Sequence, residues 1–193
     1  MVHRRTFGSR LIKSFLAYHE NSTHFPCHCV AALTTAAVLA KEPGPPTAQD
    51  IANRFYRTYL KLNPRGLPTE KEMERFAPLF TVDLSELIAV ARRQQQKFIR
   101  EHPGDKPPWI EGNLFASNFE GVSSFVLGAP TFNDDKASIP VYLEYREGKQ
   151  IGRWIDVIIL ERAKKEWRVW DIFMNAPWPF RSGPNLRAIL SVE

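Results

Sequence analysis

The chain has 193 residues, of which 44% are hydrophobic and 24% charged, so it can form one domain with a sizeable core but not two of ordinary size. The first 40 residues hold four of the 26 basic residues and only one of the 21 acidic residues, so much of the net charge of +5 lies there. The rest is close to neutral and lacks a basic stripe with interleaved aromatic side chains. This composition excludes nucleic acid as a partner.

The first 40 residues have the order of a secretory signal. Arg4, Arg5 and Arg10 precede an uncharged stretch at 30–40, which ends in small residues at Val38-Leu39-Ala40. The stretch is too short to span a bilayer as a helix, which takes about 20 residues. We therefore expect an exported bacterial protein, periplasmic or secreted, with a leader at 1–40 that is cleaved near Ala40 and a single domain at 41–193. A mitochondrial presequence is the alternative, since the segment has few acidic residues.

Two cysteines, Cys27 and Cys29, lie beside His24 and His28 in a pattern that resembles a metal-binding cluster. Zinc sites space their cysteines two to four residues apart and use a second pair of ligands, which this chain lacks. We predict no metal and no cofactor, and a domain that is stabilised by its core without disulfides. No Leu-x-x-Cys precedes either cysteine, so a lipid anchor is not supported.

Three helices are expected in the first half of the domain. Thr47 with Asp50 has the spacing of an N-cap, and Asn63-Pro64 ends the first helix. Thr69 and Glu72 form a capping box before a second, short helix. The apolar faces have helical spacing: Ile51, Phe55, Tyr59 and Leu62 in the first helix, Met73 and Phe76 in the second, and Leu84, Leu87, Ile88, Ala91, Gln95 and Phe98 in the third.

Residues 102–121 are too rich in proline and glycine for a helix or a central strand. A loop of this length in a compact domain is usually functional or ordered by its own packing. We take Trp109, Phe115 and Glu120 as a candidate binding loop, which would also suit an immunity-type inhibitor that blocks a toxin enzyme.

Four strand-like runs follow, at 122–132, 137–147, 152–163 and 167–174, and a closing helix is expected at 185–190. Short polar turns separate the runs, as in antiparallel hairpins. Helices first and strands second predict an α+β fold, with a curved antiparallel sheet packed on one side by helices.

Side-chain alternation divides the last three strands into two faces, if Arg146 lies opposite Gly152 and Arg162 opposite Trp167. The core face is expected to hold Ile139, Val141, Leu143, Ile155, Val157, Ile159, Trp170 and Ile172. The opposite face is expected to hold Tyr142, Glu144, Trp154, Asp156, Ile158, Leu160, Trp167, Val169, Asp171 and Phe173.

The second set contains three carboxylates among apolar side chains and gives a candidate pocket of Tyr142, Glu144, Trp154, Asp156 and Asp171. In a functional interpretation, the apolar walls raise a carboxylate pKa and suit it to acid or base chemistry. In a structural interpretation, which we favour, the acids are hydrogen-bonded to Tyr142, indole N–H groups or arginines. After Ala40 the only histidine is His102 and there is no cysteine, which excludes cysteine–histidine catalysis.

Several short motifs occur in order along the domain: Lys106-Pro-Pro108, Phe115 with Ser117, Glu120-Gly121, Trp154-Ile-Asp156, and Trp167-Arg-Val-Trp-Asp171. Over about residues 47–190 the chain thereby resembles a family of bacterial exported proteins of unknown function within the NTF2-like superfamily. The resemblance implies a cone in which N-terminal helices pack on a bent sheet, often with a pocket at the open end. Enzymes of that superfamily use Asp, Tyr and His there; Asp156, Asp171 and Tyr142 match, and the histidine has no counterpart.

We therefore expect a non-catalytic module that binds an envelope protein or a small ligand at the cone mouth or on the second sheet face. The alternative is a small-molecule lyase, isomerase or hydrolase with Asp156 or Asp171 as the base. No stable membrane span is expected, and homodimer formation is left open.

Overall fold

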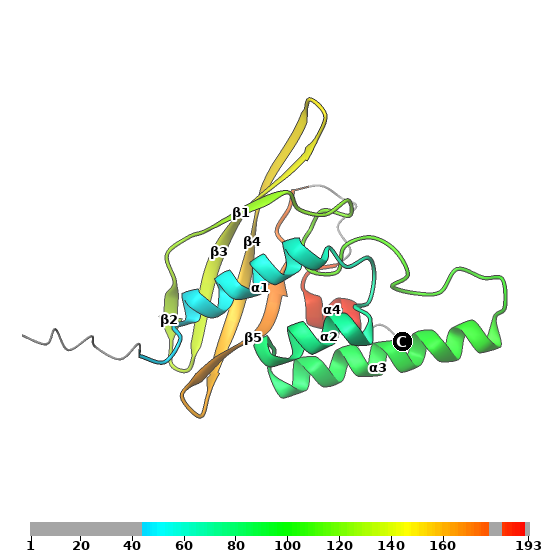
Figure 1. Ribbon diagram of the computed structural model, residues 1–193, viewed down its shortest axis with the longest axis horizontal. Coiled ribbons are helices and arrows are strands. Elements are labelled where there is room, and N and C mark those ends of the chain that lie inside the picture. Colours follow the sequence, from blue (N-terminus) through cyan, green and yellow to red (C-terminus); the bar gives the residue numbers. More distant parts are fainter. Residues whose placement is uncertain (1–43, 178–182, 192–193) are drawn as a thin grey trace, which may run out of the picture. The chain divides into compact units, whose positions relative to one another are not determined.

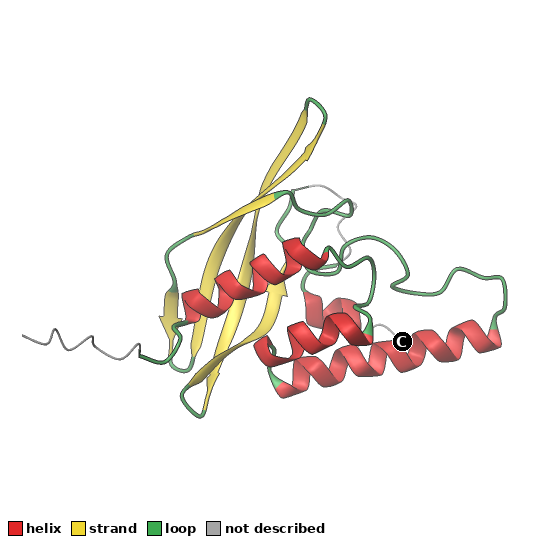
Figure 2. Ribbon diagram, in the orientation of Figure 1, coloured by secondary structure: helices red, strands yellow, loops and turns green. Residues whose placement is uncertain are grey.

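The structure is a computed structural model that describes residues 44–177 and 183–191. Helices come first, an antiparallel sheet follows, and one short helix closes the chain (Figures 1 and 2). This order confirms the predicted α+β class. The predicted leader at 1–40, including Cys27 and Cys29, lies outside the described residues. None of the helices within the described ranges combines the length and apolar character that crossing a bilayer requires.

The first two helices begin at the capping boxes that the sequence predicted. In α1 (Ala48–Leu62), the Thr47 hydroxyl accepts from the Asp50 N–H while the Asp50 carboxylate accepts from the Thr47 N–H. Thr69 and Glu72 make the same reciprocal pair at the start of α2 (Glu70–Phe76). Each box satisfies backbone donors that a helix start leaves without a partner. α1 ends at Asn63, whose φ of 44° places it in the left-handed region that stops a helix.

A 3-10 turn, η1 (Ala77–Leu79), joins α2 to α3 (Val82–Glu101). Thr81 caps α3 by accepting from the Leu84 N–H. The predicted apolar face of α3 supplies three buried residues, Leu84, Ile88 and Ala91. The backbone N–H of Thr81 donates to the Val169 carbonyl at 3.0 Å, so the start of α3 is joined to the outer strand of the sheet.

The sheet contains β1 (Ser124–Leu127), β2 (Thr131–Asn133), β3 (Lys136–Glu147), β4 (Gln150–Ala163) and β5 (Glu166–Phe173). The strand order is β1-β3-β4-β5, every pairing is antiparallel, and β2 pairs with β3 alongside β1. The sequence predicted one strand over 122–132, and the structure breaks it at Gly128-Ala-Pro130. Proline has no N–H to donate to the ladder, and Pro130 lies in this break.

α1 crosses one side of the sheet (Figure 1), and we call this side the covered face. The core between them contains an aromatic cluster of Phe55, Phe76, Phe80 and Phe115, with ring centroids 5.1–5.9 Å apart. Phe55 comes from α1, whereas Phe115 comes from the segment between α3 and β1. Ring pairs at these distances add to the stabilisation from burial of apolar area.

The predicted register between β3 and β4 is wrong by one residue. Arg146 lies opposite Ile151 rather than Gly152, because the hairpin turns on only Gly148 and Lys149, and Gly148 supplies a φ of 57°. A shift of one residue exchanges the two faces of a strand. Trp154, Asp156, Ile158 and Leu160 are therefore buried on the covered face, while Ile155, predicted to lie in the core, is 44% exposed.

The predicted pairing of Arg162 with Trp167 is confirmed, but β5 changes phase further along. Leu160 lies opposite Val169 and Ile159 lies opposite Asp171, so one residue of β5 is left over as a β-bulge. Trp167, Val169 and Ile172 are all buried as a result. The final helix, α4 (Leu186–Leu190), is capped by Asn185 and lies within the predicted range.

Candidate functional site

Asp156 is completely buried and accepts four hydrogen bonds on its two carboxylate oxygens. Oδ2 accepts from the Ser117 backbone N–H at 2.9 Å and from the Trp154 Nε1–H at 3.0 Å. Oδ1 accepts from the Ser117 hydroxyl and, at 2.9 Å, from the Asn175 N–H. One carboxylate thus joins β4 to the loop before β1 and to the chain after β5.

Asp171 is also buried, and its hydrogen bonds lead to α4. Oδ1 accepts from the Ile172 N–H at 2.8 Å and from the Arg187 N–H at 3.1 Å. Burial raises the pKa of Asp171, and the N–H groups of Arg187 and Ile172 oppose that rise. A carboxylate beside a helix start is favoured by the backbone donors there, so Asp171 anchors the closing helix.

Glu144 and Tyr142 lie on the opposite side of the sheet from Asp156. The Glu144 carboxylate accepts from Arg146 Nε–H and from Arg153 Nε–H, each at 2.8 Å. These hydrogen bonds lower the Glu144 pKa. Tyr142 is 50% exposed. The register thus divides the predicted pocket. Asp156 is buried in the core, and Tyr142 and Glu144 are on the other face. Trp154 is buried beside Asp156 but also lines a depression with Tyr142 and Glu144.

The predicted binding loop is largely fastened to the domain. Phe115 is fully buried in the aromatic cluster, and Trp109 is partly buried with its Nε1–H donating to the Ile189 carbonyl at 3.0 Å. The Gly66 N–H donates to the Gly112 carbonyl at 2.9 Å. Gly66 has a φ of 68°, and a Cβ there would collide with the Trp109 carbonyl oxygen. Of the three candidates only Glu120 is exposed.

The side of the sheet away from α1 carries a row of exposed apolar side chains that the sequence did not assign to one face. We call it the open face and define it by Val126, Tyr142, Ile155 and Phe173, which are 66%, 50%, 44% and 37% exposed. Val126 pairs with Tyr142 and Tyr142 with Ile155, so three of them form one row across β1, β3 and β4. The two-residue turn at Gly148 was the sequence signal that could have placed them.

The open face is hollowed at one end. A depression of about 390 Å³ is lined by residues of β1, β3 and β4, including Val126, Tyr142, Glu144, Arg153 and Ile155. Its walls combine apolar side chains with the ion pair of Glu144 and Arg153. Within residues 44–177 and 183–191, no group of three or more His, Cys, Asp or Glu side chains could hold a metal ion.

Comparison with protein-family models, curated proteins and solved structures gives no match. Function is therefore inferred from the geometry of the described residues.

Proposed function

We propose that this protein is a non-catalytic binding module that holds a partner protein on the open face of its sheet. The observation that carries the proposal is the row of Val126, Tyr142 and Ile155, which no described element covers. Apolar side chains gathered on a surface cost free energy in water, and such patches commonly mark interaction sites. An apolar row that is this exposed fits the surface of a protein better than it encloses a small molecule.

Charged pairs flank this row at both ends of the strands. Glu144 binds Arg146 and Arg153 at one end, while Arg168 and Glu166 pair at the other at 2.5 Å. An apolar centre with a polar, charged border is the usual composition of a protein interface. The acidic and basic side chains of this border already pair with each other. The border therefore sets the orientation of the partner protein, and the apolar centre supplies most of the binding affinity.

The contacts of the buried acids weigh against the enzyme alternative. Asp156 accepts four hydrogen bonds from the protein itself, and Asp171 accepts from the start of α4. A general base must lie within hydrogen-bond reach of a substrate proton. Both carboxylates are at most 1% exposed, and neither lines the depression on the open face.

Membership of the NTF2-like superfamily and export belong to the same proposal. Helices that precede an antiparallel sheet and cover one side of it support the NTF2-like cone. The basic start and the apolar stretch before Lys41 support export. The partner would then be a protein of the bacterial envelope.

Site-specific photo-crosslinking in the native host tests the proposed function. A photoreactive residue replaces Val126 on the open face or, as the matched control, Arg93 on the exposed side of α3. We expect one discrete adduct from position 126 and none from position 93. An adduct of twice the chain mass would identify a second copy of this chain as the partner. Absence of an adduct at 126, or the same adduct from both positions, would refute the proposal.

A further inference from the structure

A second hollow, of about 830 Å³, lies where the start of α1 meets two hairpin turns. It is lined by residues from five segments: the chain leading into α1, β2, the β2–β3 turn, the end of β4 with its turn, and the start of β5. Small-molecule sites have about this volume and combine apolar walls with a few polar groups. The hollow is separate from the open face, since the two share no lining residue.

The apolar wall of the hollow is aromatic. The rings of Phe132 and Trp167 lie 5.8 Å apart, and Pro46 lines the hollow with them. Trp167 is 9% exposed, but Phe132 is 59% exposed although it has a ring neighbour. An exposed ring beside a buried one leaves apolar surface that a planar or aliphatic group could cover.

Charged groups line the same hollow and carry a net positive charge. Arg162 lies over the Trp167 ring, 5.3 Å from its centroid, and Lys165 and Asp134 complete the set. None of these three has an ion pair within 4.0 Å in the described part of the chain, whereas nearby Lys136 and Arg168 each pair with a glutamate. Two cations against one carboxylate favour an anionic ligand.

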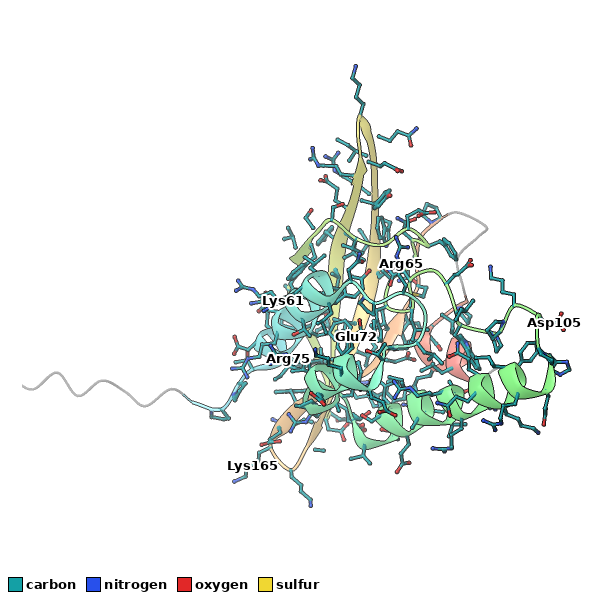
Figure 3. All side chains as sticks on the ribbon, turned by 45° about the vertical axis from the view of Figure 1, so that its right-hand side comes forward. Lys61, Arg65, Glu72, Arg75, Asp105 and Lys165 are labelled. Carbon is teal, nitrogen blue, oxygen red and sulfur yellow. The ribbon has the colours of Figure 1, made fainter. Side chains whose placement is uncertain are left out.

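The β4–β5 turn fixes where one of these cations lies. Lys164 and Lys165 have φ values of 51° and 78°, the left-handed conformation of both central positions in a type I′ turn. Lys165 lines the hollow, while its neighbour Lys164 does not. Figure 3 labels Lys165 at this end of the hairpin. Adjacent lysines with the same backbone constraint therefore differ in their access to the hollow.

We propose that this hollow binds a small amphipathic anion, with an apolar or aromatic body on Phe132 and Trp167 and an acidic group at Arg162 and Lys165. Arg162 and Lys165 hold the carboxylate, phosphate or sulfonate, since hydrogen bonds to ionised groups are the stronger ones. The ring of Phe132 excludes water from one side of the ligand. The site is independent of the partner surface on the open face.

Isothermal titration of the full chain with 2-naphthoate tests the site, with neutral 2-naphthalenemethanol and acetate as matched probes. We expect saturable binding of one 2-naphthoate, and weaker binding of both other probes, because each lacks the acid or the ring. Lys165→Gln should weaken 2-naphthoate binding about tenfold, the effect of losing one hydrogen bond to a charged group. Phe132→Ser should weaken it by a similar factor through lost apolar contact.

Two control variants show whether the bound anion occupies this hollow. Lys164→Gln removes the same charge from the adjacent turn position and should leave the affinity unchanged. Tyr142→Ala alters the open face and should also leave it unchanged. The proposal is overturned if 2-naphthoate shows no saturable binding or binds no more tightly than the neutral probe. It is also overturned if Lys164→Gln weakens 2-naphthoate binding as much as Lys165→Gln does, or if only Tyr142→Ala weakens it. Because every measurement uses purified protein without a partner, a negative result leaves the proposed function untouched.

Discussion

The two faces of the sheet use the same strands for different purposes. On the covered face, Trp154, Asp156 and Ile158 of β4 are buried against the helices and the loop before β1. On the open face, Ile155 of the same strand is 44% exposed beside Tyr142. Asp156, which the sequence offers as a candidate catalytic base, is therefore hydrogen-bonded within the fold. The open face leaves apolar side chains exposed.

The substitution Asp156→Ala, on the covered face, is expected to change the free energy of unfolding the most. The substitution removes the carboxylate that accepts from the Ser117 and Asn175 N–H groups and from the Trp154 indole N–H. We expect a loss of about 3–5 kcal/mol in the free energy of unfolding, as for breaking a buried charged network. Urea denaturation followed by circular dichroism measures it. A loss below about 1 kcal/mol would show that Asp156 is not a structural centre.

A matched pair of substitutions on β4 compares the two faces directly. Ile158 is fully buried and Ile155 is 44% exposed. Ile158→Ala should cost about 2–5 kcal/mol of unfolding free energy because it leaves a cavity, whereas Ile155→Ala should cost under about 1 kcal/mol. The same urea experiment measures both. Equal costs would mean that the open face is part of a core, contrary to the assigned register.

The raised pKa of Asp171 is expected to have a smaller effect, on how the free energy of unfolding depends on pH. Because burial raises this pKa in the folded state above its ordinary value of 3.8, the folded chain binds the proton more tightly than the unfolded chain. The corresponding stability is present below pH 3.8 and is lost as pH rises through the folded pKa. In Asp171→Asn, whose amide oxygen can still accept from Ile172 and Arg187, this loss should disappear. Unfolding free energies of both proteins between about pH 4 and 7 measure it; a constant difference would contradict it.

The smallest effect on stability is expected from Glu144. Its pKa is lowered by Arg146 and Arg153, so its contribution is present above the unfolded value of 4.5 and is lost as pH falls. The two arginines are more than half exposed, so solvent weakens the contribution. Glu144→Gln should leave the urea midpoint at neutral pH nearly unchanged. A shift as large as that of Asp156→Ala would remove the distinction between the faces.

Local signals predicted the helices because each depends on a few adjacent residues. Thr47 with Asp50 and Thr69 with Glu72 form their capping boxes, and Asn185 caps the closing helix. Assigning side chains to the two faces of the sheet depended instead on the number of residues in the β3–β4 turn. The two-residue turn at Gly148 and Lys149 moved every side chain of β4 to the other face relative to β3.

The candidate site was harder to predict, because its residues meet only through long-range contacts. The prediction that a buried acid would bond to an indole N–H is confirmed by Trp154 and Asp156. The partners Ser117 and Asn175 come from segments far along the chain, and no local pattern indicates them. The bulge in β5, which buries Ile172 together with Val169, likewise results from pairing rather than from sequence period.

The most direct test of binding on the open face combines a crosslinker at position 126 with a charge at position 155, two strands away. The measured quantity is the yield of the crosslinked adduct. Ile155→Asp lies on the same face, and Arg93→Asp on α3 serves as the control. We predict that Ile155→Asp abolishes the adduct while the chain still unfolds at a similar urea concentration, and that Arg93→Asp retains the adduct. An unchanged yield in Ile155→Asp would contradict binding on the open face.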